Sequence, residues 1–315
     1  MSTATDTIAS EYPALTERCG LVDRSERGKL ALTGTEAREF LHGQVSNDIE
    51  ALEPGRGCYA AFLTPKGKML GDLRVLDLGD ELFLDTERVS LQALFNMIRR
   101  IKLGLDVELH KRTVERGLLS LVGPDARAAA GADALPPEEH ANLAAEVGGV
   151  PVRLVATAGG VDLICDAGRT PDLKAALDLP EISEAAAEVV RVETGRPRYG
   201  LDLDESVIPQ EAGLNERAVS FTKGCYVGQE TVARLHFRGR PNRHLRGLRL
   251  SAPVPPGTPL RLGEREVGRL GSSVVSPALG PIALAIVRRE ATPGDSVTVG
   301  DSGVTATLVE LPFRE

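Results

Sequence analysis

The chain has 315 residues, a formal net charge of −8 and a pI of about 5.4, with 42% hydrophobic and 26% charged residues. That length suffices for two or three compact units, and the composition is that of a globular protein, not of a disordered or fibrous one. No apolar run approaches the roughly 18 residues that a membrane-spanning helix needs, and residues 1–12 lack the pattern of a signal peptide. We therefore expect a cytoplasmic protein with no membrane partner.

The first elements in chain order predict an α/β region. Residues 29–33 have the pattern of a strand, and Thr33 or Thr35 can cap a helix that runs through Phe40 and Leu41. Alternating apolar residues then predict a three-stranded meander, and the helical spacing that follows predicts a helix with one buried face. These segments are the strands 58–63, 69–76 and 82–85 and the helix 91–101.

A second group of elements begins near residue 118. Its expected strands are 118–123, 152–157 and 161–166, and its expected helices start at 125 and cover 171–179 and 183–194. This succession is close to a ferredoxin-like unit, which the N-terminal strand and helix would complete in space. The two α/β parts are therefore predicted to be interleaved, with roughly 1–50 joining 115–200 and 51–114 joining 201–244.

The pattern changes at residue 245. Short apolar runs alternate with turns rich in proline and glycine, such as 255–257 and 277–280. We therefore expect a small β-barrel over 245–315, following an N-terminal region of residues 1–244.

The most distinctive segment is Lys-Gly-Cys-Tyr-Val-Gly-Gln-Glu at residues 223–230. A thiolate is favoured by a nearby cation and by the start of a helix, and residues 229–237 have a helical pattern. We predict that Cys225 is a reactive thiol and that Lys223 is its electrostatic activator. The alternative is that Cys225 is a small buried hydrophobic residue under the loop.

Residues 234–249 contain six arginines and neither Asp nor Glu, so the rest of the chain carries a net charge of −14, which is −8 minus 6. Such a local positive field suits a polyanionic ligand. We expect Arg234 and Arg238 to serve this role, and Arg246 and Arg249 to lie on the solvent side of a strand. Nucleic acid is the weaker choice of ligand, because the pI of about 5.4 and the aromatic content of 3% lack a broad basic face and a stacking platform.

The four cysteines, Cys19, Cys58, Cys165 and Cys225, are widely separated. Because no Cys-x-x-Cys pair exists and the five histidines show no ligand spacing, we expect no resident metal or cluster and no disulfide framework.

The 223–230 motif, followed by Val232-Ala233-Arg234 and Arg238-Gly239, resembles the signature of the YgfZ family of folate-binding proteins, implicated in iron–sulfur cluster assembly and repair. Residues 191–200 and 208–214 are similar to a segment that this family shares with the glycine cleavage T-protein, an aminomethyltransferase. The resemblance implies an α+β fold, a three-part cloverleaf of two interleaved α/β subdomains and a C-terminal barrel. Its central hole would hold tetrahydrofolate or a one-carbon derivative.

The resemblance also implies site residues. A carboxylate can accept two hydrogen bonds from the amino group and ring N–H of the pterin, and Glu193 is the candidate for this role. Its alternative is an exposed place in the last turn of a helix. Arg234 or Arg238 could bind the glutamate tail. Further candidate folate contacts are Arg191, Tyr226 and Gln229.

T-proteins carry two consecutive acids where this chain has Gly71-Asp72, and an Asp there is thought to act on the aminomethyl substrate. Asp72 is therefore a second catalytic candidate, with simple solvent exposure as the alternative. We predict a tetrahydrofolate-binding protein that matures or repairs iron–sulfur enzymes, with client or assembly proteins as partners. The rivals are a folate-dependent one-carbon transferase that uses Asp72, and a nonenzymatic RNA-binding or scaffold protein that uses the arginine stretch. Whether the protein is an enzyme is left open.

Overall fold

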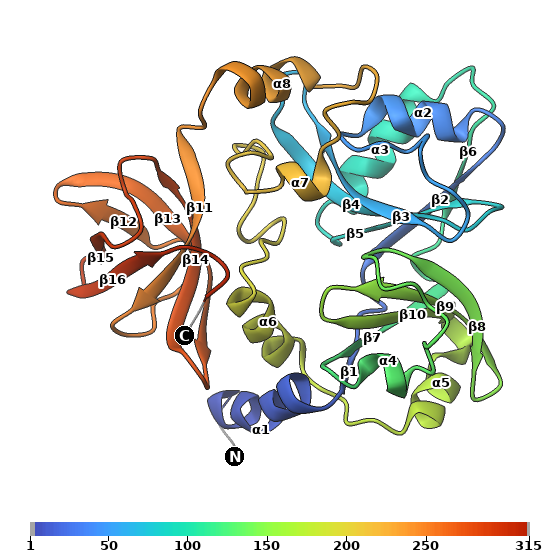
Figure 1. The fold of residues 1–315 in the computed structure, drawn as a ribbon, viewed down its shortest axis with the longest axis horizontal. Coiled ribbons are helices and arrows are strands. Elements are labelled where there is room, and N and C mark those ends of the chain that lie inside the picture. The colour runs from blue at the N-terminus through green and yellow to red at the C-terminus, as the bar shows by residue number, and fades with distance from the viewer. Residues whose placement is uncertain (1–3, 314–315) are drawn as a thin grey trace.

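A computed structural model describes residues 4–313, and it confirms the predicted α+β class. Figure 1 shows three parts: a barrel at the left, and two sheets at the right, one above the other. Helix α6 lies between the barrel and the sheets. No helix among the described residues is both long enough and apolar enough to cross a membrane.

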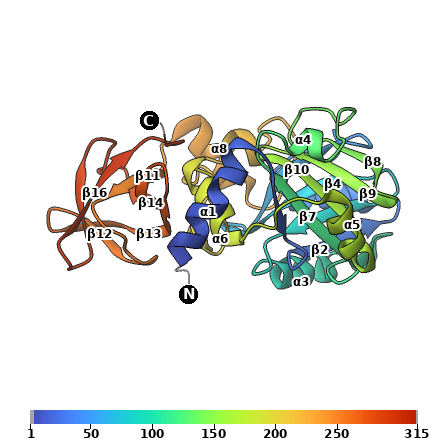
Figure 2. The same cartoon turned by 90° about the horizontal axis from the view of Figure 1, so that it is seen from below.

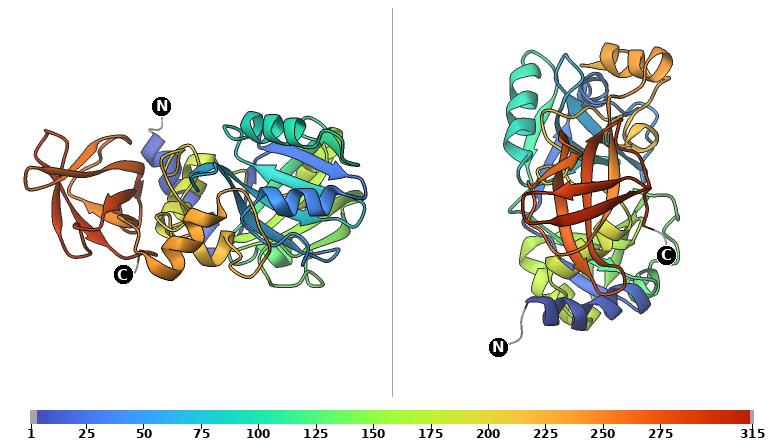
Figure 3. Two further views of the ribbon diagram at one scale, coloured as in Figure 1. Left: turned by 90° about the horizontal axis from the view of Figure 1, so that it is seen from above. Right: turned by 90° about the vertical axis from the view of Figure 1, so that its left-hand side faces the viewer.

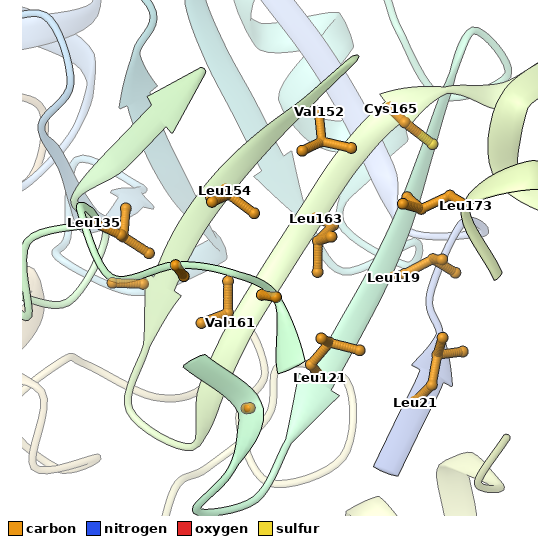
Figure 4. Packing of buried hydrophobic residues seen from close by; sticks show 14 of the residues in the cluster. Leu21, Leu119, Leu121, Leu135, Val152, Leu154, Val161, Leu163, Cys165 and Leu173 are labelled. Atoms are coloured by element: carbon orange, nitrogen blue, oxygen red, sulfur yellow. The ribbon is translucent and has the colours of Figure 1, made fainter. Parts of the chain in front are cut away.

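The lower sheet in Figure 1 is antiparallel and has the strand order β1-β7-β10-β9-β8. Its leucines and valines pack with a leucine from α5 into one core, because alternate residues of each strand face the same side (Figure 4). The elements are β1 (Gly20–Asp23), β7 (Arg116–Val122), α4 (Ala126–Ala129), β8 (Asn142–Val147), β9 (Val150–Thr157), β10 (Gly160–Asp166), the 3₁₀-helix η1 (Ala167–Arg169) and α5 (Thr170–Leu177).

The order β1-β7-β10-β9 is that of a ferredoxin-like unit whose outer strand comes from the N-terminus. This strand is β1, and not the predicted strand at 29–33. The latter is β2 (Gly28–Thr33), which lies between β5 and β6 of the other sheet. The assignment of residues 1–50 to the lower part is therefore corrected: the chain changes sheets between Asp23 and Gly28.

The upper sheet has the order β3-β4-β5-β2-β6. Thr33 and Thr35 do not cap the helix that follows β2, because Glu36 occupies the N-cap position without a side-chain bond and Thr35 instead binds the Asp106 carboxylate. The remaining elements are α2 (Ala37–Gln44), β3 (Gly57–Leu63), β4 (Met69–Asp77), β5 (Leu82–Thr86), α3 (Leu91–Ile101) and β6 (Glu108–Lys111).

The predicted C-terminal barrel is confirmed as a closed six-stranded barrel in the order β11-β14-β13-β12-β15-β16. The left view of Figure 3 shows the barrel at one end of the molecule, with the two sheets at the other end. Its strands are β11 (Arg243–Leu250), β12 (Pro259–Leu262), β13 (Arg265–Ser276), β14 (Gly280–Arg288), β15 (Ser296–Val299) and β16 (Val304–Val309).

Four helices connect the three parts: α1 (Ala4–Glu17), α6 (Glu184–Glu193), α7 (Asn215–Ala218) and α8 (Gln229–Arg238). Helix α6 is capped by Ser183, whose hydroxyl accepts from the Ala186 amide. It contacts α1, β13 and β14, and Figure 2 shows α1 and α6 side by side between the barrel and the sheets. One face of α6 is thereby left toward the sheets.

Candidate functional site

A central cavity of about 270 Å³ is lined by both sheets, α6 and α7. Its floor includes Tyr59 and Asp72, on the neighbouring strands β3 and β4, and its other side includes the 157–159 turn between β9 and β10. The charged lining residues are Arg24, Arg27, Asp72, Arg74, Glu87, Glu139, Asp162, Glu184, Arg191, Arg196, Arg198 and Arg217. A cavity that joins separately folded layers and is this polar is a natural place for a small ligand.

Arginines neutralise most of the buried acids around the cavity. Asp85 is paired with Arg27 at 2.8 Å and with Arg74 at 2.6 Å, and Arg74 also contacts Asp162 at 2.6 Å. Burial alone would raise the pKa of Asp85, but the two guanidinium groups hold this pKa far below its ordinary value. The Asp85 carboxylate therefore remains charged and fixes both arginines.

Asp72 is the exception among the buried acids of the cavity. Its carboxyl is buried and accepts a 2.5 Å hydrogen bond from the Tyr59 hydroxyl, and no Lys or Arg forms an ion pair with it among residues 4–313. Burial raises the pKa of Asp72 to about 6; the Tyr59 bond opposes this shift and the Glu87 charge adds to it. A carboxyl group with a pKa near neutrality can both accept and return a proton.

Lys223 lines the same surface hollow as Cys225, but its ammonium is bound by backbone carbonyls, and its role as the activator of Cys225 stays a prediction. Its ammonium is buried and donates to the carbonyl oxygens of His42, of Val45 at 2.8 Å and of Asn47 at 2.9 Å, which lie at and beyond the end of α2. Desolvation lowers the pKa of Lys223 to about 8. The lysine therefore holds the 223–230 loop to α2, as expected for a cation at the negative end of a helix.

Other residues of the 223–230 loop also have structural roles. Tyr226 is buried in a core that includes Leu63 and Met69. The centre of its ring lies 5.0 Å from the Lys223 Nζ atom. Gly228 has a φ of 87°, and a Cβ there would lie 2.6 Å from the Thr64 oxygen, so only glycine fits against the β3–β4 turn. Gln229 donates to the Gly224 oxygen at 3.3 Å. The predicted folate contacts Tyr226 and Gln229 are not among the residues that line the central cavity.

Cys225 is the one cysteine of the described chain that is exposed. It lies in a surface hollow with His42, Asp48 and Glu50, four residues before α8, and not in the central cavity. The expectation that it is a buried hydrophobic residue is therefore wrong. Burial raises the pKa of Cys19 to about 11 and that of Cys58 to about 12, so neither of them is a competing nucleophile near neutral pH.

The two predicted folate ligands on α6 differ in position. Arg191 lines the cavity, but its guanidinium is bound by Glu188, Ser272 and, at 3.0 Å, Asp202. The Glu193 carboxylate accepts from the Tyr12 hydroxyl at 3.0 Å and from Ser276 at 2.5 Å. It thus joins α1, α6 and the barrel, outside the cavity lining.

The arginine stretch does not form one surface. Arg234 and Arg238 are exposed on α8, where Phe221 and His236 stack at 3.7 Å. Further along, Arg243 pairs with Glu211 at 2.7 Å and Arg246 with Glu310 at 3.4 Å. Acids from distant parts of the chain thus neutralise part of the stretch, which the local sequence could not reveal.

Four cavity residues that sequence reasoning missed are Tyr59, Glu139, His140 and Arg217. Tyr59 could have been inferred from Asp72, because Ala61 is opposite Asp72 in the strand pair and Tyr59 lies two residues before Ala61 on the same face of β3. The other three residues reach the cavity from a loop and a one-turn helix. Glu138, Glu139 and His140 are three consecutive titratable residues between two prolines and an alanine, and that is a weak signal.

Comparison with known proteins gives a consistent family. Residues 1–158 match the model of the GCVT N-terminal domain, and residues 243–314 match that of the glycine cleavage T-protein C-terminal barrel domain. An aminomethyltransferase of Streptomyces avermitilis is 30% identical over 330 residues, covering 96% of this chain and 88% of its own. An aminomethyltransferase of Rubrobacter xylanophilus is 28% identical over 320 residues, which cover 97% of this chain and 86% of the relative.

The fold is also that of a solved structure. The glycine cleavage system aminomethyltransferase T of Bartonella henselae superposes with a TM-score of 0.86 at 23% identity, over 98% of this chain and 89% of the other. At this identity the match speaks for the fold alone.

Proposed function

The chain belongs to the glycine cleavage T-protein family, and we propose that it is a tetrahydrofolate-binding one-carbon transferase of the aminomethyltransferase type. The cofactor is the one that the family resemblance implies, and the central cavity is its site. The family matches favour this function over a role in iron–sulfur enzyme maturation.

The observation that carries this proposal is the state of Asp72. It is a buried carboxyl with a pKa of about 6, hydrogen-bonded to Tyr59, and among the described residues no Lys or Arg forms an ion pair with it. When a folate nitrogen forms a bond to an incoming one-carbon unit it loses a proton, and the carbon's former partner leaves with the electrons of the broken bond. The Asp72 carboxylate would accept that proton and return it to the departing group.

Calorimetric titration of the full chain with tetrahydrofolate tests the binding step. We expect saturable binding of one tetrahydrofolate per chain, with little dependence on salt because the ligand is enclosed. Absence of binding would overturn the proposal. An affinity that falls steeply with salt would instead favour a surface site on the exposed arginines of α8 and the scaffold or RNA-binding alternative.

A second candidate function is favoured by the exposure of Cys225. We propose that, if the protein acts in the YgfZ manner in iron–sulfur enzyme maturation or repair, Cys225 is the thiol that meets the client or assembly protein. Replacement of Cys225 by Ser removes the soft nucleophile with little change in volume. Cells that carry this variant should show lower iron–sulfur enzyme activities at an unchanged level of the protein, whereas full complementation of a null strain would exclude this role.

A further inference from the structure

Helix α8 presents an exposed face at the outer edge of the molecule, on the chain that leads into the barrel (Figure 1). The helix buries one residue, Val232, whose carbonyl oxygen accepts from the Gln210 side chain at 2.6 Å. Arg234, Phe237 and Arg238 are three and four residues apart, so they share one face of the helix. All three side chains are exposed, and Phe237 exposes 68% of its area. The face thus has an aromatic ring beside two guanidinium groups.

Two further rings hold Phe237 in place. The rings of Phe221 and His236 stack at 3.7 Å, and the Phe237 ring meets them at steep angles, with centres 6.2 Å and 4.8 Å away. Both arrangements are favoured geometries for aromatic pairs. Phe221 in turn packs against the core that contains Tyr226. The exposed ring is therefore fixed before any partner arrives, which lowers the entropy cost of a contact with it.

The surface around this ring is positive. Arg240 directly follows the end of α8, and the end of β14 lies beside the same linker, since the Arg289 amide donates to the Asn242 oxygen at 2.9 Å. Five arginines from these segments are exposed, and within residues 4–313 none of them forms an ion pair with Asp or Glu. They are Arg234, Arg238, Arg240, Arg288 and Arg289.

Acids that border this surface have partners of their own or lie at its margin. Glu211 binds Arg243 at 2.7 Å, and Glu290 binds Arg265 at 3.1 Å. Glu230 lies in the first turn of α8, at the end of the helix that is farther from the linker. A positive surface is thus left on a chain whose formal net charge is −8, and its field attracts an anionic partner.

The chemistry of the surface favours a protein as that partner. Guanidinium groups bind carboxylates through two parallel hydrogen bonds, and aromatic residues and arginines contribute most of the binding energy at protein interfaces. A nucleic acid fits less well, because its extended row of phosphates would leave the arginines and meet the acidic remainder of the chain. A short acidic segment can stay within the positive surface.

We propose that this surface docks an acidic segment of a partner protein. Carboxylates of the partner pair with the five arginines, and an apolar side chain between those carboxylates packs on Phe237. None of these residues lines the central cavity. The inference therefore goes beyond the proposed folate-dependent reaction and does not depend on it.

Three fluorescein-labelled peptides of equal length test the surface by fluorescence anisotropy with the full chain. One is rich in glutamate and has a central tryptophan, the second has serine in place of the tryptophan, and the third has lysine in place of every glutamate. We expect the tryptophan peptide to bind about tenfold more tightly than the serine peptide, and the lysine peptide not to bind. Equal affinities for the two acidic peptides, or no binding of the tryptophan peptide up to about 1 mM protein, would overturn the proposal.

A variant of the ring locates the apolar contact. Phe237→Ala should lower the affinity for the tryptophan peptide about tenfold, to that of the serine peptide. Leu103→Ala is the control, because Leu103 is 79% exposed but lies beyond the end of α3, and it should change neither affinity. An unchanged preference for tryptophan in Phe237→Ala would show that the ring is not the anchor.

A matched pair of triple variants locates the charge contact. Replacing Arg234, Arg238 and Arg240 by Gln should weaken both acidic peptides at least about tenfold. The control replaces three exposed arginines in and before α3, which removes the same net charge and should change the affinities less than about twofold. They are Arg88, Arg99 and Arg100. Equal losses in the two triple variants would mean that only the net charge matters, and the docking surface would be wrong.

Other occupants of the surface give different results. A single-stranded oligouridylate of about 12 nucleotides that binds more tightly than the tryptophan peptide, and loses this affinity in Phe237→Ala, would assign the surface to nucleic acid. Self-association of the chain alone in sedimentation, abolished by Phe237→Ala, would assign it to a second copy. Either result would overturn the proposal. Melting temperatures of all variants should equal that of the wild type, because every replaced side chain is exposed.

Discussion

The central cavity and the 223–230 loop differ in how their chemistry is encoded. The loop is one continuous motif, yet three of its residues have structural roles: Lys223 binds it to the end of α2, Tyr226 packs in the core, and Gly228 lies against the β3–β4 turn. The cavity has no local motif, because its residues come from positions 24 to 217, and it contains Asp72 with its raised pKa. A distinctive sequence thus marks where the chain is constrained, whereas the groups with perturbed titration mark where a ligand can react.

The largest expected effect is on catalysis in the cavity. Asp72→Asn keeps an oxygen for the Tyr59 hydrogen bond but cannot take up a proton, so the rate of folate-dependent one-carbon transfer should fall between about 100-fold and 10,000-fold. Tetrahydrofolate affinity should change little. Asp133→Asn, an exposed acid in the lower part, is the control. A variant with more than a tenth of wild-type activity would show that Asp72 is not the acid–base group.

The same substitution should make the protein more stable. Burial raises the pKa of Asp72 from 3.8 to about 6, so the folded state holds this proton more tightly than the unfolded state does. Wild-type stability is therefore lost as the pH rises through this window, by about 3 kcal/mol in total. Urea unfolding of Asp72→Asn should show a gain over the wild type that grows between pH 4 and pH 6 and is constant above it. A difference that does not depend on pH would mean that the carboxyl is already ionised at pH 4.

Lys223 distinguishes an anchoring role in the loop from an activating one. Lys223→Met removes the donor to three backbone carbonyls and should cost about 2 kcal/mol of stability, whereas exposed Lys66→Met should cost almost nothing. In the native protein, iodoacetamide should label Cys225 well before Cys19 and Cys58, and Lys223→Met should not slow this labelling. Slower labelling of Cys225 alone would restore Lys223 as its activator.

Sequence patterns predicted much of the fold because the periodicity of buried residues is local. The meander β3–β5, helix α3 and the barrel all follow from spacing and turns. Strands β1 and β8 were missed, since β1 has four residues and the core-facing positions of β8 are small or only partly buried. The change of sheet between β1 and β2 depends on long-range pairing, and no local signal contains it.

The candidate site was less predictable for the same reason. Asp72 could be named from family resemblance, but its raised pKa depends on tertiary burial, and the hydrogen bond that opposes this shift comes from Tyr59 on the neighbouring strand. Glu139 and Arg217 meet only because the chain folds residues 78 positions apart onto one cavity. The exposure of Cys225 and the capture of Lys223 by carbonyls of α2 are likewise tertiary facts.

The smallest expected effect is on the dissociation constant of tetrahydrofolate, measured by calorimetry for variants of two glutamates. Glu193 is bound by Tyr12 and Ser276 between α1, α6 and the barrel, whereas Glu139 faces the cavity. Glutamine keeps the size of either side chain and can still accept hydrogen bonds, but it removes the negative charge that a pterin N–H would meet. Glu193→Gln should therefore leave the dissociation constant of tetrahydrofolate within about twofold of the wild type, and Glu139→Gln should raise it about tenfold. The reverse result would support Glu193 as the pterin ligand, and it would require the folate site to extend from the cavity to the junction of α1 with the barrel.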